Sequence, residues 1–548
     1  MDEHLLHISS NNSIIEVEFV YDSKTVLFSR PCKDSVKQFL QRCEIKLSSP
    51  QKKKKKNFSG DSFSDVPGVT CIFLSSDLIK LNNDLLLEKV LLDDSNKFQI
   101  NDIVYSLVIN LPKVVSATVS SHAMATYLIQ PTVETQFSSH FQCKWFVETE
   151  PRSYTEVREG NVYEPPVHFV NKNFKIEITP FQEERRGKTV TVLSQAPIQA
   201  PVGETPLTVR QQLTMMTSRN IKSDFRVVSY NVLADCYVFT EWAMRNMYPQ
   251  CPKYILPMEY RKQILYREFT DYSADILALQ EVEEKFFQNE LLPFFETVGM
   301  TGVYSTLNAR RSDGEALIYN KNLFDLRESK TLSMNESCYD SEVLTIFLRI
   351  CSHDLREDFL CRTTTFQYCL LEMKKRSKYV LVVNSHLAAK HNFDVVRLLQ
   401  TATAAHFVKC KSEQICADLN ISKSNLAIFL LGDLNSSPDA FATRYMHKEV
   451  LDIEELDPMS AGTQFTLQLP EDLVSMESCY PRWSIEFTNM VFNFTSTLDW
   501  IYYNRDVLEC VNKLPMPSLE SVASYGGLPN VGMASDHLAL VADFAFIT

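Results

Sequence analysis

The sequence lacks the runs and spacings that mark several classes of protein. Nowhere in its 548 residues does an uninterrupted apolar run reach the ~18 residues of a bilayer-spanning helix. Its 14 cysteines include no Cys-x-x-Cys pair and no repeated spacing. This scatter indicates reduced intracellular thiols rather than a disulfide framework or a zinc site. No internal repeat is visible.

The beginning of the chain also lacks a targeting pattern. Met1–His7 carries acidic residues, and no arginine precedes Arg30. A signal peptide would show a basic and then an apolar stretch, and a mitochondrial presequence would be rich in arginine and poor in acids. Taken alone, the N-terminal residues predict a cytoplasmic protein.

An excess of basic residues is absent as well, since the formal net charge is −13. Proteins that hold a long duplex usually present a basic face to its phosphates. The acidic balance therefore predicts few phosphate contacts and a short or single-stranded substrate. The one strongly basic run, Lys52–Lys56, is typical of a solvated loop, and an RNA-steering segment is the alternative interpretation.

The composition is that of a globular protein, with 45% hydrophobic and 22% charged residues, and the length predicts two or three domains. Near the start, Ile15, Val17 and Phe19 alternate with glutamates, which is the period of a half-buried strand. Similar runs predict a β-rich N-terminal domain over residues 1–190. A proline-containing stretch without sustained periodicity, residues 191–222, predicts a linker.

From residue 223 to residue 548 the pattern changes to short apolar strands that alternate with amphipathic helices. This alternation predicts a layered α/β fold. The predicted strands are Phe225–Asn231, Asp275–Glu281, Val380–His386, Ile428–Asn435 and Leu498–Tyr503, and the clearest helices are Glu259–Thr270 and Asp394–Lys409.

Polar residues stand where these strands end. Strand ends of layered sheets converge on one edge, so residues far apart in sequence can share a pocket. Taken singly, each fragment has a bland explanation, because an asparagine after a strand is usually a turn residue and a histidine there usually belongs to the core. Six fragments in one order instead predict a common site. Its members are Asn231, Glu281, His386, Asp433 with Asn435, Asp499, and Asp536 with His537.

Oxygen ligands without cysteine suit Mg²⁺, with Mn²⁺ as a second candidate. Hydrolysis of a phosphodiester needs a cation at the phosphoryl oxygens, a base for water and donors for the developing charge. We predict Glu281 as the principal metal ligand, with Asp433, Asn435 and Asp536 completing the shell.

The remaining side chains suit proton transfer and charge stabilisation. Asp433 is predicted to be the general base that removes the proton from the attacking water. His386 and His537 are predicted to donate to the phosphoryl oxygens. Asp499 is predicted to fix the tautomer and charge of His537.

The ordered fragments resemble the endonuclease/exonuclease/phosphatase superfamily, whose fold is a four-layered α/β sandwich, and within it the deadenylase-like branch. The resemblance implies a catalytic role for Asn231 as well. It lies nearest to mitochondrial members of that branch that degrade 2′,5′-oligoadenylate and trim poly(A). The stretches that carry it are Ser229–Asp235, Leu279–Val282, Leu528–Asn530 and Ser535–His537.

The resemblance also implies a pair of residues that hold the adenine base. These are Asn489 and Phe494, ten and five residues before Asp499. An amide can pair with a base edge, and an aromatic face can stack on it. The implied substrate is single-stranded, adenylate-rich RNA or 2′,5′-oligoadenylate, cleaved to release 5′-AMP, and the implied compartment is the mitochondrial matrix.

Three alternatives stay open at this point. One is a poly(A)-specific 3′,5′ deadenylase without 2′,5′ activity, and another is an inositol-phosphate phosphatase of the same superfamily. The third is an RNA-binding relative that has lost the chemistry. Neither a membrane nor an obligate protein partner is indicated by the sequence.

Overall fold

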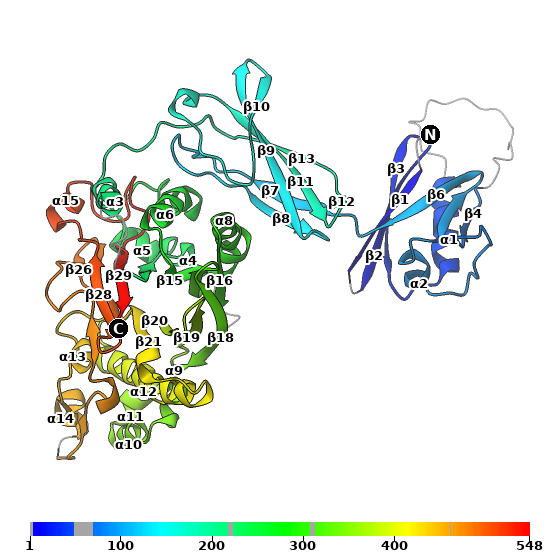
Figure 1. The fold of residues 1–548 in the computed structure, drawn as a ribbon. Helices are drawn as coiled ribbons and strands as arrows, with labels where there is room; N and C mark the ends of the chain where they lie inside the picture. The colour runs from blue at the N-terminus through cyan, green and yellow to red at the C-terminus, as the bar shows by residue number, and fades with distance from the viewer. Residues whose placement is uncertain are drawn as a thin grey trace.

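The computed structural model describes residues 4–11, 13–48, 69–216, 223–306, 313–460 and 462–547. Along the chain these residues form a small sheet with two helices, a second sheet, and a large sandwich of two sheets (Figure 1). The five-lysine run predicted as a loop at 52–56 lies outside the described residues.

The first sheet has the strand order β3-β2-β1-β6-β5-β4, and helix α1 packs on it. The predicted alternation is confirmed in β2, where Ile15, Val17 and Phe19 are buried and the glutamates between them are exposed. The elements are β1 (Leu5–Asn11), β2 (Ile14–Tyr21), β3 (Lys24–Pro31), α1 (Val36–Ser48), β4 (Cys71–Leu74), α2 (Leu87–Leu91), β5 (Lys97–Ile100) and β6 (Ile103–Ile109).

The second sheet has a hydrophobic core of its own around Trp145 and Ile176. The region predicted as one β-rich domain therefore holds two cores, because alternation shows which face of a strand is buried but not which strands share a core. The strands of this sheet are β9 (His140–Glu150), β10 (Ser153–Glu159), β11 (Phe174–Gln182), β12 (Arg185–Arg186) and β13 (Val190–Leu193), and β7 (Lys113–Thr118) pairs with β8 (Thr132–Gln136) in a separate two-stranded sheet of the same unit.

This second unit contacts the sandwich through helix α6 (Met258–Tyr272). The side chain of Gln263 accepts a hydrogen bond from the backbone N–H of Met124 at 3.0 Å. Lys262, which is buried, donates to Thr132 Oγ1 at 3.1 Å. Polar groups on one turn of α6 thus connect the second unit to the sandwich.

The predicted linker, residues 191–222, contains the helix α3 (Pro206–Met216). Its Arg210 is buried and donates to the carbonyl oxygens of Ala539 at 2.7 Å and Pro515 at 3.2 Å. These bonds tie α3 to the sandwich.

The sandwich consists of two six-stranded sheets with the orders β16-β17-β15-β14-β29-β28 and β18-β19-β20-β21-β27-β24. Every predicted strand of this region is present, with boundaries within two residues. The first sheet holds β14 (Phe225–Asn231), β15 (Ile276–Glu283), β16 (Met300–Ser305), β17 (Asp313–Asn320), β28 (Leu508–Lys513) and β29 (Leu540–Phe546). The second holds β18 (Phe324–Ser333), β19 (Thr365–Met373), β20 (Tyr379–His386), β21 (Leu426–Asp433), β24 (Met476–Ser478) and β27 (Asp499–Asn504).

The two sheets pack face to face around an apolar core that includes Phe225, Phe429 and Phe544. Helices cover the outer faces, with α6 on the first sheet and the long helix α12 (Asp394–Asp418) on the second. The predicted four-layered α/β sandwich is confirmed. In the described part of the chain, no helix has both the length and the apolarity to cross a membrane.

Strand direction brings the predicted site residues to one end of the sandwich. β14 runs parallel to β15 with Asn231 opposite Gln280, and β20 runs parallel to β21 with His386 opposite Asp433. β27 is antiparallel to β21, so its first residue, Asp499, also lies opposite Asp433. The carboxyl ends of parallel strands share an edge, which here becomes the edge of the site.

A buried ion pair between neighbouring strands gives a test of the fold. Arg226 donates to both carboxylate oxygens of Asp543, at 2.6 and 3.0 Å. We expect Asp543→Ala to lower the free energy of unfolding by about 3–5 kcal/mol, because it leaves a buried guanidinium unpaired. Chemical denaturation measures the change. The control is Glu477→Ala, which removes the exposed ion pair with Arg505. It should lower the free energy of unfolding by less than about 1 kcal/mol. Similar losses of stability in both variants would contradict this account.

Candidate active site

The side chain of Asn231 joins two carboxylates that come from different sheets. Its Nδ2 donates to Glu281 Oε1 and to Asp433 Oδ2, each at 3.0 Å. Asn231 and Asp433 end strands of opposite sheets, and both are fully buried. The structure therefore brings these three predicted residues together, with one amide holding both acids.

Glu281 enters this cluster from a strained backbone conformation. The pairing of β15 with β17 shifts register between Leu279 and Val282, which is a β-bulge. Glu281 lies inside it with a φ of 56°, in the left-handed region. Such a conformation costs about 1–3 kcal/mol and concentrates at functional sites. The backbone N–H of Ala234 holds the second carboxylate oxygen of Glu281 at 3.0 Å.

Two imidazoles flank Asp433. His537 places Nδ1 2.8 Å from Asp499 Oδ2 and Nε2 3.5 Å from Asp433 Oδ2. His386 Nε2 lies 3.5 Å from the same Asp433 oxygen and 3.9 Å from Glu281 Oε1. Burial lowers the pKa of both histidines, but the carboxylates outweigh it, so the pKa of His386 is raised and that of His537 is raised well above its ordinary value. Both rings are therefore suited to carry a proton.

The turn after β21 is fixed by close backbone contacts. The backbone N–H of Asn435 donates to Asp433 Oδ1 at 2.8 Å, and its Nδ2 donates to Leu387 O at 2.9 Å. The residue before Asp433 is Gly432, with a φ of 131°, where a Cβ would lie 2.0 Å from Ser385 O. Only glycine fits there, so β21 and β20 can approach closely beneath the site.

Asp536 is held by a residue that the sequence did not indicate. Tyr248 donates its hydroxyl to Asp536 Oδ2 at 2.8 Å. Burial, followed by the Asp536 charge, raises the pKa of Tyr248, so its hydroxyl stays protonated and remains a donor. Ser535 Oγ donates to the backbone carbonyl oxygen of Asn231 at 2.7 Å, which links the residue before Asp536 to the end of β14. Tyr248 lies in a segment of short helices without clear periodicity, so no sequence signal marked it.

Arg261 is a second buried residue that sequence reasoning missed. It lies on α6 and connects the loop after Asn231 with the loop before Asp536. All of its N–H groups are used, as expected for a buried guanidinium. They donate to the carbonyl oxygens of Leu256 at 2.6 Å, Val232 at 2.9 Å, Leu233 at 2.7 Å and Ala534 at 3.2 Å, and to Asp235 Oδ1 at 2.8 Å.

The two predicted substrate residues lie on one hairpin, formed by β25 (Asn489–Val491) and β26 (Phe494–Ser496). Asn489 is buried, and its Nδ2 lies 3.4 Å from Asp536 Oδ2. Phe494 is 50% exposed and pairs with Val491 in the same hairpin. The structure thus places Asn489 in the acidic cluster and leaves the Phe494 ring open to a ligand.

The charges of the cluster fit a divalent cation. Among the described residues, none of its acids forms an ion pair with a lysine or arginine, and Glu281, Asp433 and Asp499 pair with imidazoles. Oxygen donors of this kind suit hard divalent ions, which often need only one or two carboxylates besides water. The described residues hold one group of three donors within 4.8 Å of one another, Asp433, Asp499 and His537. It shares only Asp433 with the predicted ligands, which are Glu281, Asp433, Asn435 and Asp536.

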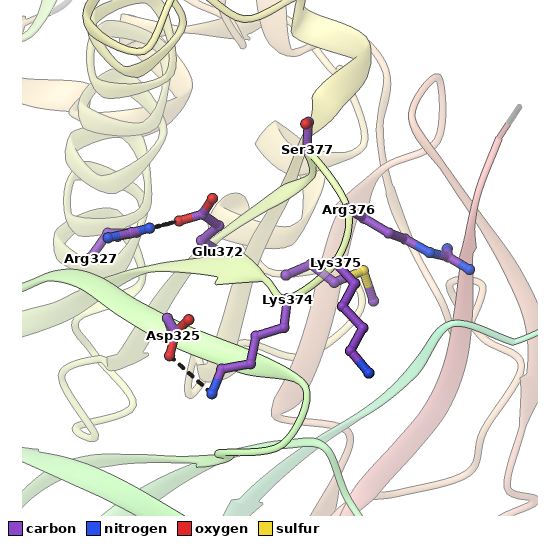
Figure 2. Close-up of a pocket in the computed structure, with 8 residues that line it drawn as sticks. Asp325, Arg327, Glu372, Lys374, Lys375, Arg376 and Ser377 are labelled. Atoms are coloured by element: carbon purple, nitrogen blue, oxygen red, sulfur yellow. Dashed lines mark hydrogen bonds and ion pairs between the residues drawn. The ribbon is translucent and has the colours of Figure 1, made fainter.

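A charged surface pocket elsewhere on the sandwich is unrelated to this site. Asp325, Arg327 and Glu372 line it, with residues 374–377 of the hairpin that joins β19 to β20 (Figure 2). Lys374 pairs with Asp325 at 3.1 Å. His386 lies at the far end of β20, about 23 Å away for a strand of that length. The pocket and the acidic cluster are therefore separate sites.

Comparison with known proteins gives consistent matches. A model described as the Endonuclease/Exonuclease/phosphatase family matches residues 228–537. The 2′,5′-phosphodiesterase 12 of Homo sapiens is 27% identical over 527 residues, 90% of this chain and 84% of that protein. The CCR4-Not complex 3′-5′-exoribonuclease subunit Ccr4 of Mycosarcoma maydis is 24% identical over 348 residues, 59% of this chain and 50% of that protein. A crystal structure of ANGEL2, a 2′,3′-cyclic phosphatase, covers 58% of this chain and 95% of its own, with 23% identity and a TM-score of 0.46.

The matched span is more than half of the chain and runs from β14 through His537, so it contains all of the predicted catalytic and metal-binding residues. This chain is an enzyme that belongs to the Endonuclease/Exonuclease/phosphatase family.

Proposed function

We propose that this chain is a Mg²⁺-dependent phosphodiesterase that releases 5′-AMP from single-stranded, adenylate-rich RNA, including 2′,5′-oligoadenylate and poly(A). The observation that carries the proposal is the convergence of Asn231, Glu281, Asp433 and His537 at the joined ends of two sheets. The similarity to a human 2′,5′-phosphodiesterase over 90% of this chain supports the 2′,5′ activity. We propose the mitochondrial matrix as its compartment, with the cytoplasm as the alternative.

The cation would be held by Glu281, with Asp433, Asn435 and Asp536 completing or orienting its shell. What a bound Mg²⁺ or Mn²⁺ supplies is polarisation of a phosphoryl oxygen and compensation of the negative charge that builds up there. Asp433 and Asp536 are buried and form no ion pair with a lysine or arginine of the described residues, which supports this assignment because charges of one sign are costly to bury uncompensated.

Asp433 is the proposed general base. Its Oδ2 accepts from Asn231 and faces both imidazoles, while Oδ1 accepts from the Asn435 backbone. A carboxylate fixed on both oxygens is oriented before the substrate arrives, which is what proton removal from an attacking water requires.

His537 and His386 are the proposed donors to the phosphoryl oxygens. The Asp499 carboxylate orients the His537 ring from the side away from Asp433 and favours its protonated form. A protonated ring directed into a buried site can donate to the charge that develops at phosphorus.

The terminal adenine is proposed to stack on Phe494 and to meet the amide of Asn489. A 2′,5′ and a 3′,5′ linkage present the same phosphate, so one metal site can serve both, and discrimination depends on how the ribose and base are held. An adenine also explains an exposed aromatic beside the site better than an inositol ring does, since an inositol has no π-face to stack.

The strongest alternative is a 3′,5′ exoribonuclease without 2′,5′ activity, which the similarity to the Ccr4 subunit supports. Product analysis with 2′,5′-triadenylate and 3′,5′-triadenylate in parallel separates the two functions, because only the proposed enzyme releases 5′-AMP from both.

Loss of the base tests the chemistry. We expect Asp433→Ala to lower kcat on 2′,5′-triadenylate by about 10³-fold, because it removes the proposed general base. Chromatographic quantification of released 5′-AMP measures the rate. The matched control is Asp325→Ala in the distant charged pocket, which should leave the rate unchanged. Near-normal hydrolysis by the Asp433 variant would refute this mechanism.

Removal of the metal tests the assignment of the acids. Dialysis against EDTA should abolish release of 5′-AMP, and Mg²⁺ should restore it. Glu281→Gln should need a higher Mg²⁺ concentration for half-maximal activity, since it loses one carboxylate charge while keeping its shape. A wild-type enzyme that stays fully active in EDTA would be incompatible with the proposed cofactor.

The adenine contact gives a third test. We expect Phe494→Ala to lower kcat/KM on oligoadenylate by about tenfold, which is within the range for losing one stacked base, whereas Phe494→Tyr keeps the ring and should keep most of the activity. Steady-state kinetics on both linkages measure the effect. An Ala variant as active as wild type would remove Phe494 from the site.

A further inference from the structure

The segment between Ala234 and Tyr248 begins and ends at the acidic cluster. At its start, the backbone N–H of Ala234 donates to Glu281 Oε2 at 3.0 Å. At its end, the Tyr248 hydroxyl donates to Asp536 Oδ2 at 2.8 Å. We call this segment the rim, because both of its ends bind residues of the site.

This rim exposes large aromatic side chains. Phe239 follows helix α4 (Asp235–Val238) and is 50% exposed, and Trp242 lies in helix α5 (Glu241–Asn246) and is 66% exposed. Helix α5 itself is well anchored, because Ala243 is buried and its N–H donates to the Thr240 cap at 3.0 Å. The Trp242 ring is thus presented to solvent by a fixed helix.

The rim is joined to the hairpin that carries Phe494. The backbone N–H of Phe492, at the tip of that hairpin, donates to the carbonyl of Met247 at 2.9 Å. Phe492 is 46% exposed. Trp242 precedes Met247 by five residues, a rise of about 7.5 Å along a helix. Exposed rings therefore continue from the proposed adenine site along its rim.

A cation lies one helical turn from the Trp242 ring. Arg245 follows at the i+3 position, which is on the same side of α5. Its side chain is 77% exposed, and its pair with the equally exposed Glu241 is long, at 3.6 Å. Such a surface pair is worth little, so the guanidinium is available to a phosphate.

We propose that Trp242, with Phe239 and Phe492 beside it, is a stacking platform for the nucleotides beyond the second one from the cleaved end, and that Arg245 contacts a phosphate between them. The proposal rests on the proposed function, because the occupant is the rest of the oligonucleotide whose end is cleaved. Stacking accepts any base and needs few cations, which fits a chain with a net charge of −13. A duplex cannot use such a platform, since its bases are already stacked.

The test compares substrate lengths on the full chain with Mg²⁺. Diadenylate ends before the platform, whereas octa-adenylate reaches it. We expect Trp242→Ala to lower kcat/KM on octa-adenylate by about tenfold and to leave that on diadenylate unchanged. Trp242→Phe should retain most of the octa-adenylate activity. Alanine is a strong helix former at this exposed position, so the variant should fold. Val298→Ala, at an apolar residue that is 55% exposed elsewhere, is the control.

A second substrate isolates stacking from other effects. This substrate is an octamer that keeps its terminal adenines but has abasic sites beyond them. Wild type should cleave it with the same low kcat/KM that Trp242→Ala shows on octa-adenylate. On the abasic octamer, Trp242→Ala should have the same kcat/KM as wild type. An equal loss on both lengths, or no loss on the octamer, would overturn the platform and leave the hydrolysis intact. A wild-type enzyme that cleaves neither length would overturn the proposed function, and the platform with it.

Discussion

The site depends on a polar junction between two otherwise apolar sheets. Asn231 donates across the sandwich to Asp433, and beneath it Gln280 donates to Asn384 at 2.8 Å, whose own amide donates to Leu279 O at 3.0 Å. Hydrogen bonds are directional, while packing of aromatic and aliphatic side chains tolerates some sliding. The amides therefore set the register of one sheet against the other, and this register brings Glu281 to Asp433.

Charged residues gather at the same junction, and helix α6 holds the loops that carry them. Arg261 binds the backbone of both loops that carry site residues, and the next two residues of α6, Lys262 and Gln263, bind the second β-unit. One helix thus supports the catalytic loops on one side and holds an accessory sheet on the other. This arrangement gives the second unit a structural connection to the site that does not require it to touch a substrate.

Much of the catalytic sandwich could be predicted because its signal is local. Apolar strands that end in Asn231, Asp433 or His386 mark both the element and its functional end. Contacts made through irregular segments could not be predicted in this way. Tyr248 and Arg261 look like ordinary aromatic and basic residues until the fold closes around them, and the two N-terminal cores differ only in which strands pair over long range. The predicted metal ligands also differ from the three donors that lie closest together in the structure. Spacing in sequence does not determine how side chains are oriented around a shared ion.

The central claim is that the buried acids hold a divalent ion, and diffraction locates such an ion directly. Crystals grown with Mn²⁺ and measured at its absorption edge should show an anomalous peak about 2.0–2.2 Å from a carboxylate oxygen of Glu281, within the cluster completed by Asp433 and Asp536. Density for an ion elsewhere on the molecule, with none beside Glu281 at millimolar Mn²⁺, would contradict the account.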